Sequence, residues 1–197
     1  GATRFVFSSS RLVYASNLGR PMKEQDAPAP DSTYGLSKLF GESVVRFQAS
    51  RLGIRATSLR ISQLVGPGDG NRGALARFAE SARSGGPITV TGDGVAVRDV
   101  LDVRDASRSI RLALDALDST EVPLAINIGG GGRSIRCLAE IAAEAAGHGT
   151  ELIQHTATDH EDTSHWSLNT ALAASALGWQ PQVDLVEALR HRWITDA

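Results

Sequence analysis

The stretch DSTYGLSKLFGE, residues 31–42, places a tyrosine and a lysine four positions apart, at Tyr34 and Lys38. The surrounding apolar residues recur at helical spacing, so the two side chains are predicted to lie on one face of a helix, about one turn apart. An ammonium group beside a phenol favours the phenolate, which makes a tyrosine usable as a general acid or base near neutral pH. The spacing alone leaves both a proton-transfer site and an ordinary surface helix open.

A second candidate group precedes this helix. Residues 4–10, RFVFSSS, form a short apolar run that ends in hydroxyl residues, which predicts a buried strand leading into a loop. Ligand sites in α/β folds lie at the carboxyl ends of parallel strands. Ser10 is therefore expected to present its hydroxyl group to the same pocket as Tyr34.

The remaining elements must position these groups. Helices are predicted over about 33–52, 74–84, 105–117 and 134–146, followed by two short helices near 170–179 and 185–194. Strands are predicted over 55–62, 88–92, 97–103 and 124–128. This alternation indicates an α/β fold with parallel strands. The His- and Asp-rich segment 155–166 is predicted to be a loop.

Composition narrows the classes of function. A chain of 197 residues with 42% hydrophobic residues can bury a core of one domain or a domain and a half. Its formal charge is −2 and no basic tract exceeds a pair, which argues against nucleic-acid or anionic-membrane binding. No apolar run approaches the ~20 residues of a membrane span. The single Cys137, predicted to be buried on a helix, suggests a reducing, cytoplasmic location.

Six motifs resemble those of the extended short-chain dehydrogenase/reductase family, the NAD-dependent epimerase/dehydratase group that acts on nucleotide sugars. In order, they are FVFSSSRLVY, STYGLSKLFGE, LRISQLVGPGDG, GDGVAVRDVLDVRDAS, INIGGGGRSIRCLAEI and ALGWQP. The resemblance covers nearly the whole chain. It implies the C-terminal part of a Rossmann-like parallel sheet over 1–65 and a smaller α/β substrate-binding region over 66–197. Within the latter, 97–117 is expected to pack back on the Rossmann-like part.

The resemblance also implies catalytic roles. Tyr34 is the acid/base, Lys38 promotes its ionisation and holds the nicotinamide ribose, and Ser10 hydrogen-bonds the substrate oxygen that is oxidised or reduced. Ser8 and Ile61 complete the expected contacts with the cofactor, which is NAD or NADP. A hydride passes between the sugar carbon and the nicotinamide in that mechanism, while the tyrosine handles the proton.

Two further residues are implied to bind the nucleotide-sugar substrate. Arg98 matches an arginine that contacts the substrate diphosphate, a task that suits a planar, permanently charged guanidinium group. A salt bridge to Asp99 or Asp102 is the structural alternative. Gln63 stands where most family members have asparagine. It keeps the amide group implied to contact the substrate, on a side chain that is one methylene group longer.

The residues after Ser10 favour one group of reactions. Dehydratases and decarboxylases of the family carry an acidic residue where this chain has Arg11 and Leu12. Epimerisation at C4 or reduction of a ketone is therefore favoured, and RDVLDVRD resembles reductases of 4-keto-6-deoxy sugars. A non-catalytic nucleotide-sugar-binding or assembly module and a reductase of a non-sugar ketone stay open. The sugar, the nucleotide, the choice of NAD or NADP and the reaction direction also stay open.

Family members carry further βα units before the serine strand, including a G-x-x-G-x-x-G turn that binds the dinucleotide pyrophosphate. This sequence contains no counterpart, so the chain alone is expected to bind NAD poorly. An unpaired strand edge promotes association. A missing amino-terminal segment, a partner chain or a second copy in a homo-oligomer is expected to cover the edge.

Two glycine-rich stretches and three histidines have alternative interpretations. Residues 68–73, GDGNRG, match G-x-G-x-x-G, but a lone match preceded by Pro67 is weak evidence for dinucleotide binding, and a substrate-region loop is favoured. The INIGGGGRS stretch, 126–134, could bind an anion, but a tight turn is favoured. His155, His160 and His165 recur every five residues, which matches no common zinc pattern, so no metal is expected.

Overall fold

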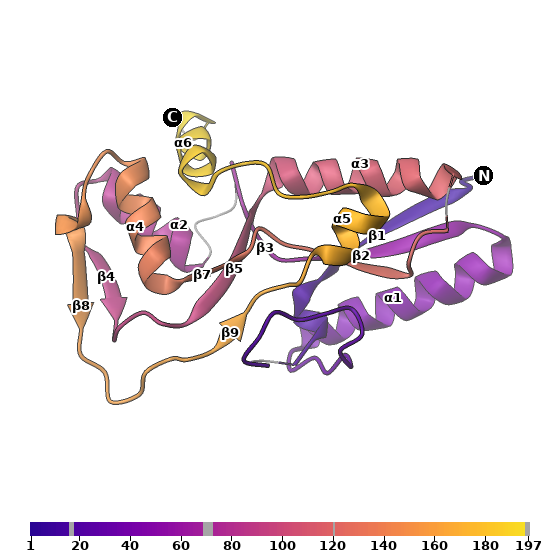
Figure 1. Cartoon of the computed structure of the whole chain (residues 1–197), viewed down its shortest axis with the longest axis horizontal. Helices are drawn as coiled ribbons and strands as arrows, with labels where there is room; N and C mark the ends of the chain where they lie inside the picture. The colour runs from indigo at the N-terminus through magenta and orange to yellow at the C-terminus, as the bar shows by residue number, and fades with distance from the viewer. Residues whose placement is uncertain (16–17, 69–72, 120, 196–197) are drawn as a thin grey trace.

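The computed structural model describes residues 1–15, 18–68, 73–119 and 121–195 (Figure 1). Its first sheet has three parallel strands in the order β1 (Arg4–Ser10), β2 (Arg55–Ile61) and β6 (Ala125–Ile128). Helix α1 (Thr33–Leu52) and helix α3 (Val103–Ser119) cover opposite faces of this sheet, as Figure 1 shows. Helix α5 (Ala171–Leu177) packs against β6 and α3. The arrangement is that of an α/β layered fold.

The core of this part is formed by apolar residues of β2, β6 and the helices that cover them. Leu59, Ile126 and Trp179 are fully buried, and they belong to one cluster with residues of α3 and α5. The buried indole N–H of Trp179 donates to the carbonyl oxygen of Asp105 at 3.0 Å. The 3₁₀ turn Arg11–Val13 follows β1 directly and begins the segment that leads to α1.

The other strands form two further sheets. One contains β3 (Gln63–Val65), β5 (Val97–Asp102), β7 (Gly132–Ser134) and β9 (His165–Trp166), and β7 is antiparallel to β5. The other pairs β4 (Ile88–Thr91) with β8 (Ile153–Thr156). Helices α2 (Ala74–Arg83) and α4 (Ile135–Ala145) pack against each other, α6 (Leu185–Thr195) packs on α4, and a 3₁₀ turn spans Thr150–Leu152. These helices share a second core with β4 and β5.

The predicted helices and the strands over 55–62, 88–92, 97–103 and 124–128 are confirmed to within a few residues. The predicted loop over 155–166 is confirmed for residues 157–164, whereas the two ends of the segment pair with earlier strands as parts of β8 and β9. Strands β3 and β7 were not predicted either. Cys137 is half-buried rather than buried.

Elements from both sides of residue 65 build the first sheet and its cover. Helix α3 contacts β1 and β2, and β6 pairs with β2, although both follow residue 66 in the chain. The three-stranded unit therefore contains segments that are far apart in sequence. A domain boundary at residue 65 stays a prediction.

A buried polar network ties α1 to the first sheet. The Arg60 guanidinium group forms an ion pair with Glu42 at 2.8 Å, and Glu42 also accepts a hydrogen bond from Ser9 Oγ at 2.5 Å. Arg60 donates to the Tyr14 hydroxyl group at 2.8 Å, and that group donates to Asn127 Oδ1 at 2.8 Å. The Arg60 and Glu42 side chains are only 6% and 11% exposed.

Burial affects the pKa values of two residues in this network, Arg60 and Tyr14. Desolvation lowers the pKa of Arg60, but the hydrogen bonds and charges of Glu42 and Tyr14 outweigh it, so the pKa lies above its ordinary value. Burial raises the pKa of Tyr14 above its ordinary value, against the opposing effect of Arg60. Arg60 is therefore charged and Tyr14 neutral at physiological pH.

Replacing Arg60 by methionine is expected to lower the free energy of unfolding by about 3–5 kcal/mol, because the Glu42 carboxylate is left buried without its cation. Urea denaturation of the purified chain measures this change. Arg83 on α2 is the matched control, because it is exposed and, in the described part of the chain, pairs with Glu80 on the same helix. Arg83→Met should change the free energy by less than about 1 kcal/mol. Equal effects of the two substitutions would contradict the prediction.

Candidate functional site

The hydroxyl group of Ser10 lies where β1 ends and the 3₁₀ turn begins. Ser10 caps this turn, and its Oγ accepts a hydrogen bond from the Leu12 backbone N–H at 3.2 Å. Ser9, on the preceding position, is held by Glu42 of α1. The end of the strand is thus fixed by one local contact and one contact from a helix.

Close packing brings the first turn of α1 against this segment. Ser32 caps the helix by accepting from the Gly35 N–H at 3.1 Å. A Cβ atom on Gly35 would overlap the backbone carbonyl oxygen of Leu12 and lie 3.0 Å from Cβ of Pro30. Only glycine allows this approach, which places Tyr34 beside the turn that carries Ser10.

Lys38 links the same helix to β1. Its Nζ donates to the backbone carbonyl oxygen of Ser8 at 2.9 Å. The same atom lies 5.5 Å from the centroid of the Tyr34 ring and 5.3 Å from that of Phe7. The lysine is therefore positioned next to the tyrosine, as the helical spacing predicts.

These side chains line one cleft of about 660 Å³. The predicted residues in its wall are Ser8, Ser10, Tyr34, Lys38, Ile61 and Gln63. The Tyr34 residue is 53% exposed. The structure brings together the predicted catalytic and cofactor-binding residues, although their roles stay predictions.

Arg98 lines a neighbouring cleft of about 330 Å³. Its guanidinium group forms an ion pair with Asp162 at 2.7 Å and donates to Ser164 Oγ at 3.0 Å. Hydrogen bonds from Ser164, together with the Arg98 guanidinium group, hold the pKa of Asp162 below its ordinary value. Gln63 and Arg11 line both clefts, so the two are adjacent.

Neither carboxylate considered as a partner for Arg98 fills that role. Asp99 is buried and accepts hydrogen bonds from the backbone N–H groups of Gly130 and Leu168 at 2.7 and 2.9 Å, and Asp102 pairs with Arg104 at 2.9 Å. Burial raises the pKa of Asp99. Arg98 does form a salt bridge, but with Asp162 and not with Asp99 or Asp102 as predicted. Backbone N–H groups bind Asp99, and Arg104 binds Asp102.

Arg11 and Asp162 were not predicted to be residues of the site. Arg11 could have been found, because it directly follows Ser10 and is a cation at the end of the same strand. Asp162 carried no such signal, since it lies in the polar segment 64 residues after Arg98.

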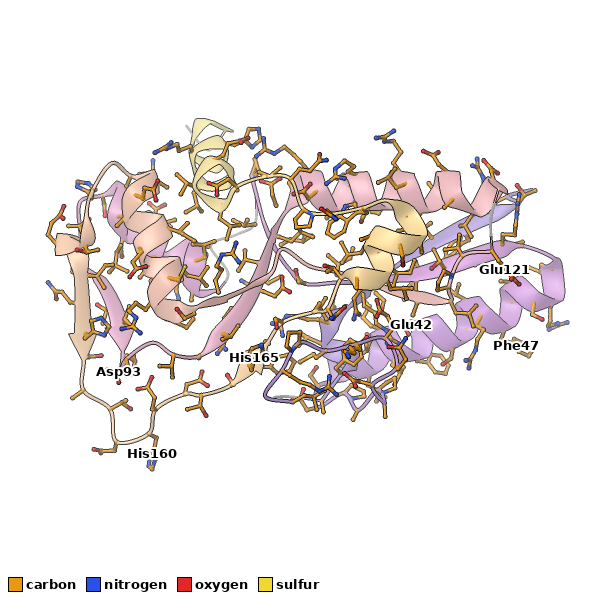
Figure 2. All side chains as sticks on the ribbon, in the orientation of Figure 1. Glu42, Phe47, Asp93, Glu121, His160 and His165 are labelled. Carbon is orange, nitrogen blue, oxygen red and sulfur yellow. The ribbon has the colours of Figure 1, made fainter. Side chains whose placement is uncertain are left out.

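The glycine-rich stretches and the histidines form no second site in the described chain. Residues 69–72 of GDGNRG lie outside the described residues. Within the 126–134 stretch, residues 129–131 form the turn that joins β6 to β7, as favoured, and the Gly130 N–H donates to Asp99. Figure 2 shows His160 at the tip of a loop and His165 well away from it on β9. No group of three or more metal-ligating side chains occurs among the described residues.

Replacing Gly35 by alanine is expected to cost about 1–3 kcal/mol of stability, because the added methyl group overlaps a backbone atom that cannot rotate away. Gly86→Ala is the matched control, since a Cβ there would meet its nearest atoms at an ordinary 3.5 Å. Thermal unfolding of the two variants measures the difference. If Gly35→Ala were as stable as Gly86→Ala, the packing of α1 on the Ser10 turn would be looser than described.

Comparison with known proteins places this geometry in a family. A model of the "NAD dependent epimerase/dehydratase family" matches residues 1–129. The chain is 33% identical to a dTDP-6-deoxy-L-talose 4-dehydrogenase (NAD(P)(+)) of Kitasatospora kifunensis, over 98% of this chain and 64% of that protein. It is 28% identical to a dTDP-4-dehydro-6-deoxyglucose reductase of Escherichia coli, over 96% of this chain and 60% of that protein.

A solved structure confirms the predicted fold class. The UDP-glucose 4-epimerase of Thermotoga maritima, crystallised with UDP-glucose, superposes with a TM-score of 0.79 and 30% identity, over 100% of this chain and 64% of that one. The chain therefore spans less than two thirds of the length of these relatives. No helix among the described residues is long and apolar enough to cross a membrane. With most of its residues matched by the family model, the chain belongs to the NAD-dependent epimerase/dehydratase family.

Proposed function

We propose that this chain is the catalytic portion of an NAD(P)-dependent enzyme that reduces, at C4, a 4-keto-6-deoxy sugar carried on a nucleotide. The observation that carries this proposal is the convergence of Ser10, Tyr34 and Lys38 on one cleft at the carboxyl end of β1, next to a second cleft lined by Arg98. The two relatives that act on dTDP-linked 6-deoxy sugars favour reduction over epimerisation.

The proposed roles follow from the contacts of each residue. Lys38 is fixed by the Ser8 carbonyl group beside the Tyr34 ring, where its charge favours transfer of the phenolic proton to the substrate oxygen. Ser10 uses its Oγ as an acceptor for Leu12, so it retains its O–H to donate to the same substrate oxygen. Arg98 binds the substrate diphosphate in the adjacent cleft in place of Asp162.

The cleft residues are suited to one end of the cofactor. Ser8, Lys38 and Ile61 contribute a hydroxyl group, an ammonium group and an apolar side chain to the lining of the cleft, and such groups suit a ribose and a nicotinamide ring. A bound nicotinamide dinucleotide supplies the hydride in such a reaction. The protein's own contribution is to position the substrate oxygen and to move a proton to it.

A further polypeptide segment completes the dinucleotide site in this proposal. The chain spans 60–64% of the two dTDP-sugar relatives, and β1 is an edge strand among the described residues. Phe5 on this strand is 46% exposed beside an apolar pocket formed with α1. These features support an added parallel strand next to β1, as unpaired strand edges bind other strands.

The outer side of α1 supports association with a second copy. Leu36, Phe40, Val44 and Phe47 recur at helical spacing, and all four are exposed, with Phe40 at 69% and Phe47 at 60%. Figure 2 labels Phe47 on this helix. An apolar stripe of this kind is typical of a helix that packs against another helix.

Tyr34→Phe tests the proposed chemistry. The assay supplies the chain with the part of the Kitasatospora relative that the match does not cover, NADPH or NADH, and a dTDP-4-keto-6-deoxyhexose. We expect kcat to fall by about 10²- to 10⁴-fold without the proton donor, while substrate affinity stays within about twofold. Ser43→Ala, an exposed change on the same helix, should leave kcat unchanged. Retention of most activity by Tyr34→Phe would refute the assigned role, and binding without turnover would support a non-catalytic module.

Phe47→Glu tests the association surface. We expect the unaltered chain to sediment as a dimer or larger species, and the added charge to shift it towards the monomer, since burying an unpaired carboxylate is unfavourable. Leu124→Glu is the matched control, because Leu124 is also 60% exposed but lies just before β6 and outside α1. Sedimentation velocity measures both variants. A monomeric unaltered chain, or an equal shift by both substitutions, would contradict the proposal.

A further inference from the structure

Arg11 stands at the junction of the two clefts and contributes to the walls of both. Its guanidinium carbon lies 4.6 Å from the centroid of the Trp166 ring, which stacks against it. Its Nη1 atom is inaccessible to solvent and has no hydrogen-bond partner among the described residues. A buried donor without an acceptor is costly, so a group of this kind calls for an explanation.

The charged groups around Arg11 provide no hydrogen-bond acceptor for its Nη1 atom among the described residues. Burial lowers the pKa of this arginine and the nearby Arg98 charge acts in the same direction, whereas Asp99 and Asp31 oppose them. The Asp99 carboxylate already accepts two backbone hydrogen bonds. Asp162 is bound to Arg98. Two guanidinium groups therefore lie near one another, while Asp99 and Asp162 are engaged by other partners.

We propose that Arg11 binds an anionic group with two oxygen atoms, a phosphate or a carboxylate, on a ligand that extends from one cleft into the other. A planar guanidinium group matches such a group with two parallel hydrogen bonds. Stacking on Trp166 fixes the plane of the guanidinium group before the ligand arrives. The site rests on the proposed function, in which a nucleotide sugar spans the distance from Arg98 to Tyr34.

The position of Arg11 limits which part of the ligand it contacts. It follows Ser10 directly, so its ligand group lies between the reacting sugar carbon and the group bound by Arg98. A phosphate of the diphosphate meets this condition, and so does a carboxylate on the sugar. Both present the same chemistry to the arginine, and they can be separated by the choice of probe.

Calorimetric titration with three probes tests the site: inorganic pyrophosphate, UDP-glucose and UDP-glucuronate. In Arg11→Gln, the loss of a charge-assisted pair of hydrogen bonds should weaken binding by about 10- to 100-fold. Equal losses for all three probes assign the diphosphate, and a loss confined to UDP-glucuronate assigns a sugar carboxylate. Either result supports the site.

Two further variants control for folding and charge. Arg11→Lys keeps the charge but not the planar fork, so it should retain part of the affinity, and it carries the test if Arg11→Gln does not fold. Arg83→Gln removes an exposed arginine away from both clefts and should bind as the unaltered chain does. Circular dichroism establishes that each variant is folded.

Fluorescence of the unaltered chain provides a readout that needs no change at Arg11. Occupation of the guanidinium group should alter the emission of the stacked Trp166, and Trp166→Phe should abolish that change. Failure of all three probes to bind the folded chain, or affinities of Arg11→Gln within twofold of those of the unaltered chain for every probe, overturns the inference.

The outcomes for this site and for the proposed function are distinguishable. Loss of pyrophosphate binding in Arg11→Gln, with no turnover of any nucleotide sugar by the unaltered protein, upholds the anion site and refutes the function. Turnover by the unaltered protein with unchanged binding in Arg11→Gln upholds the function and refutes the anion site.

Discussion

The buried ion pair between Arg60 and Glu42 is the contact on which the rest of the site depends. It joins β2 to α1, and Glu42 extends it to β1 through Ser9. The Tyr14 hydroxyl group continues it to Asn127 of β6. Two charges removed from water are stable only while each satisfies the other. The pair therefore fixes the register of the helix on the sheet, and with it the placement of Tyr34 and Lys38 relative to the serines of β1.

Much of this architecture could be predicted from the sequence because the main helices and the parallel strands have clear patterns of apolar residues. The convergence of Ser10 and Tyr34 followed from the rule that strand ends in α/β folds carry ligand sites. Strands β7, β8 and β9 were missed because they are short and polar, and only pairing with β5 and β4 defines them. Sequence patterns report local preferences, and these strands depend on distant partners.

The same limit applies to the electrostatics of the site. The role of Arg98 was inferred from a motif, but its partner Asp162 is supplied by a segment with no regular pattern. Glu42 would be taken for a solvated residue of a surface helix, yet its side chain is only 11% exposed. Arg11 was noticed only as a departure from an acidic pattern, while its stacking on Trp166 and its place between the clefts required coordinates. Charges are the part of a site that a single sequence specifies least.

Hydrogen bonds and an ion pair hold the segment that carries Asp162. Glu161 accepts a hydrogen bond from the backbone N–H of Asp93, in the turn after β4, and Asp162 holds Arg98. An anion that takes Arg98 must compete with this carboxylate, so part of its binding energy is spent in releasing the loop. Coupling of this kind is reciprocal. A ligand that drew the 157–164 loop away from β5 would raise the affinity of Arg98 for anions by the factor by which the anion raises the affinity for that ligand.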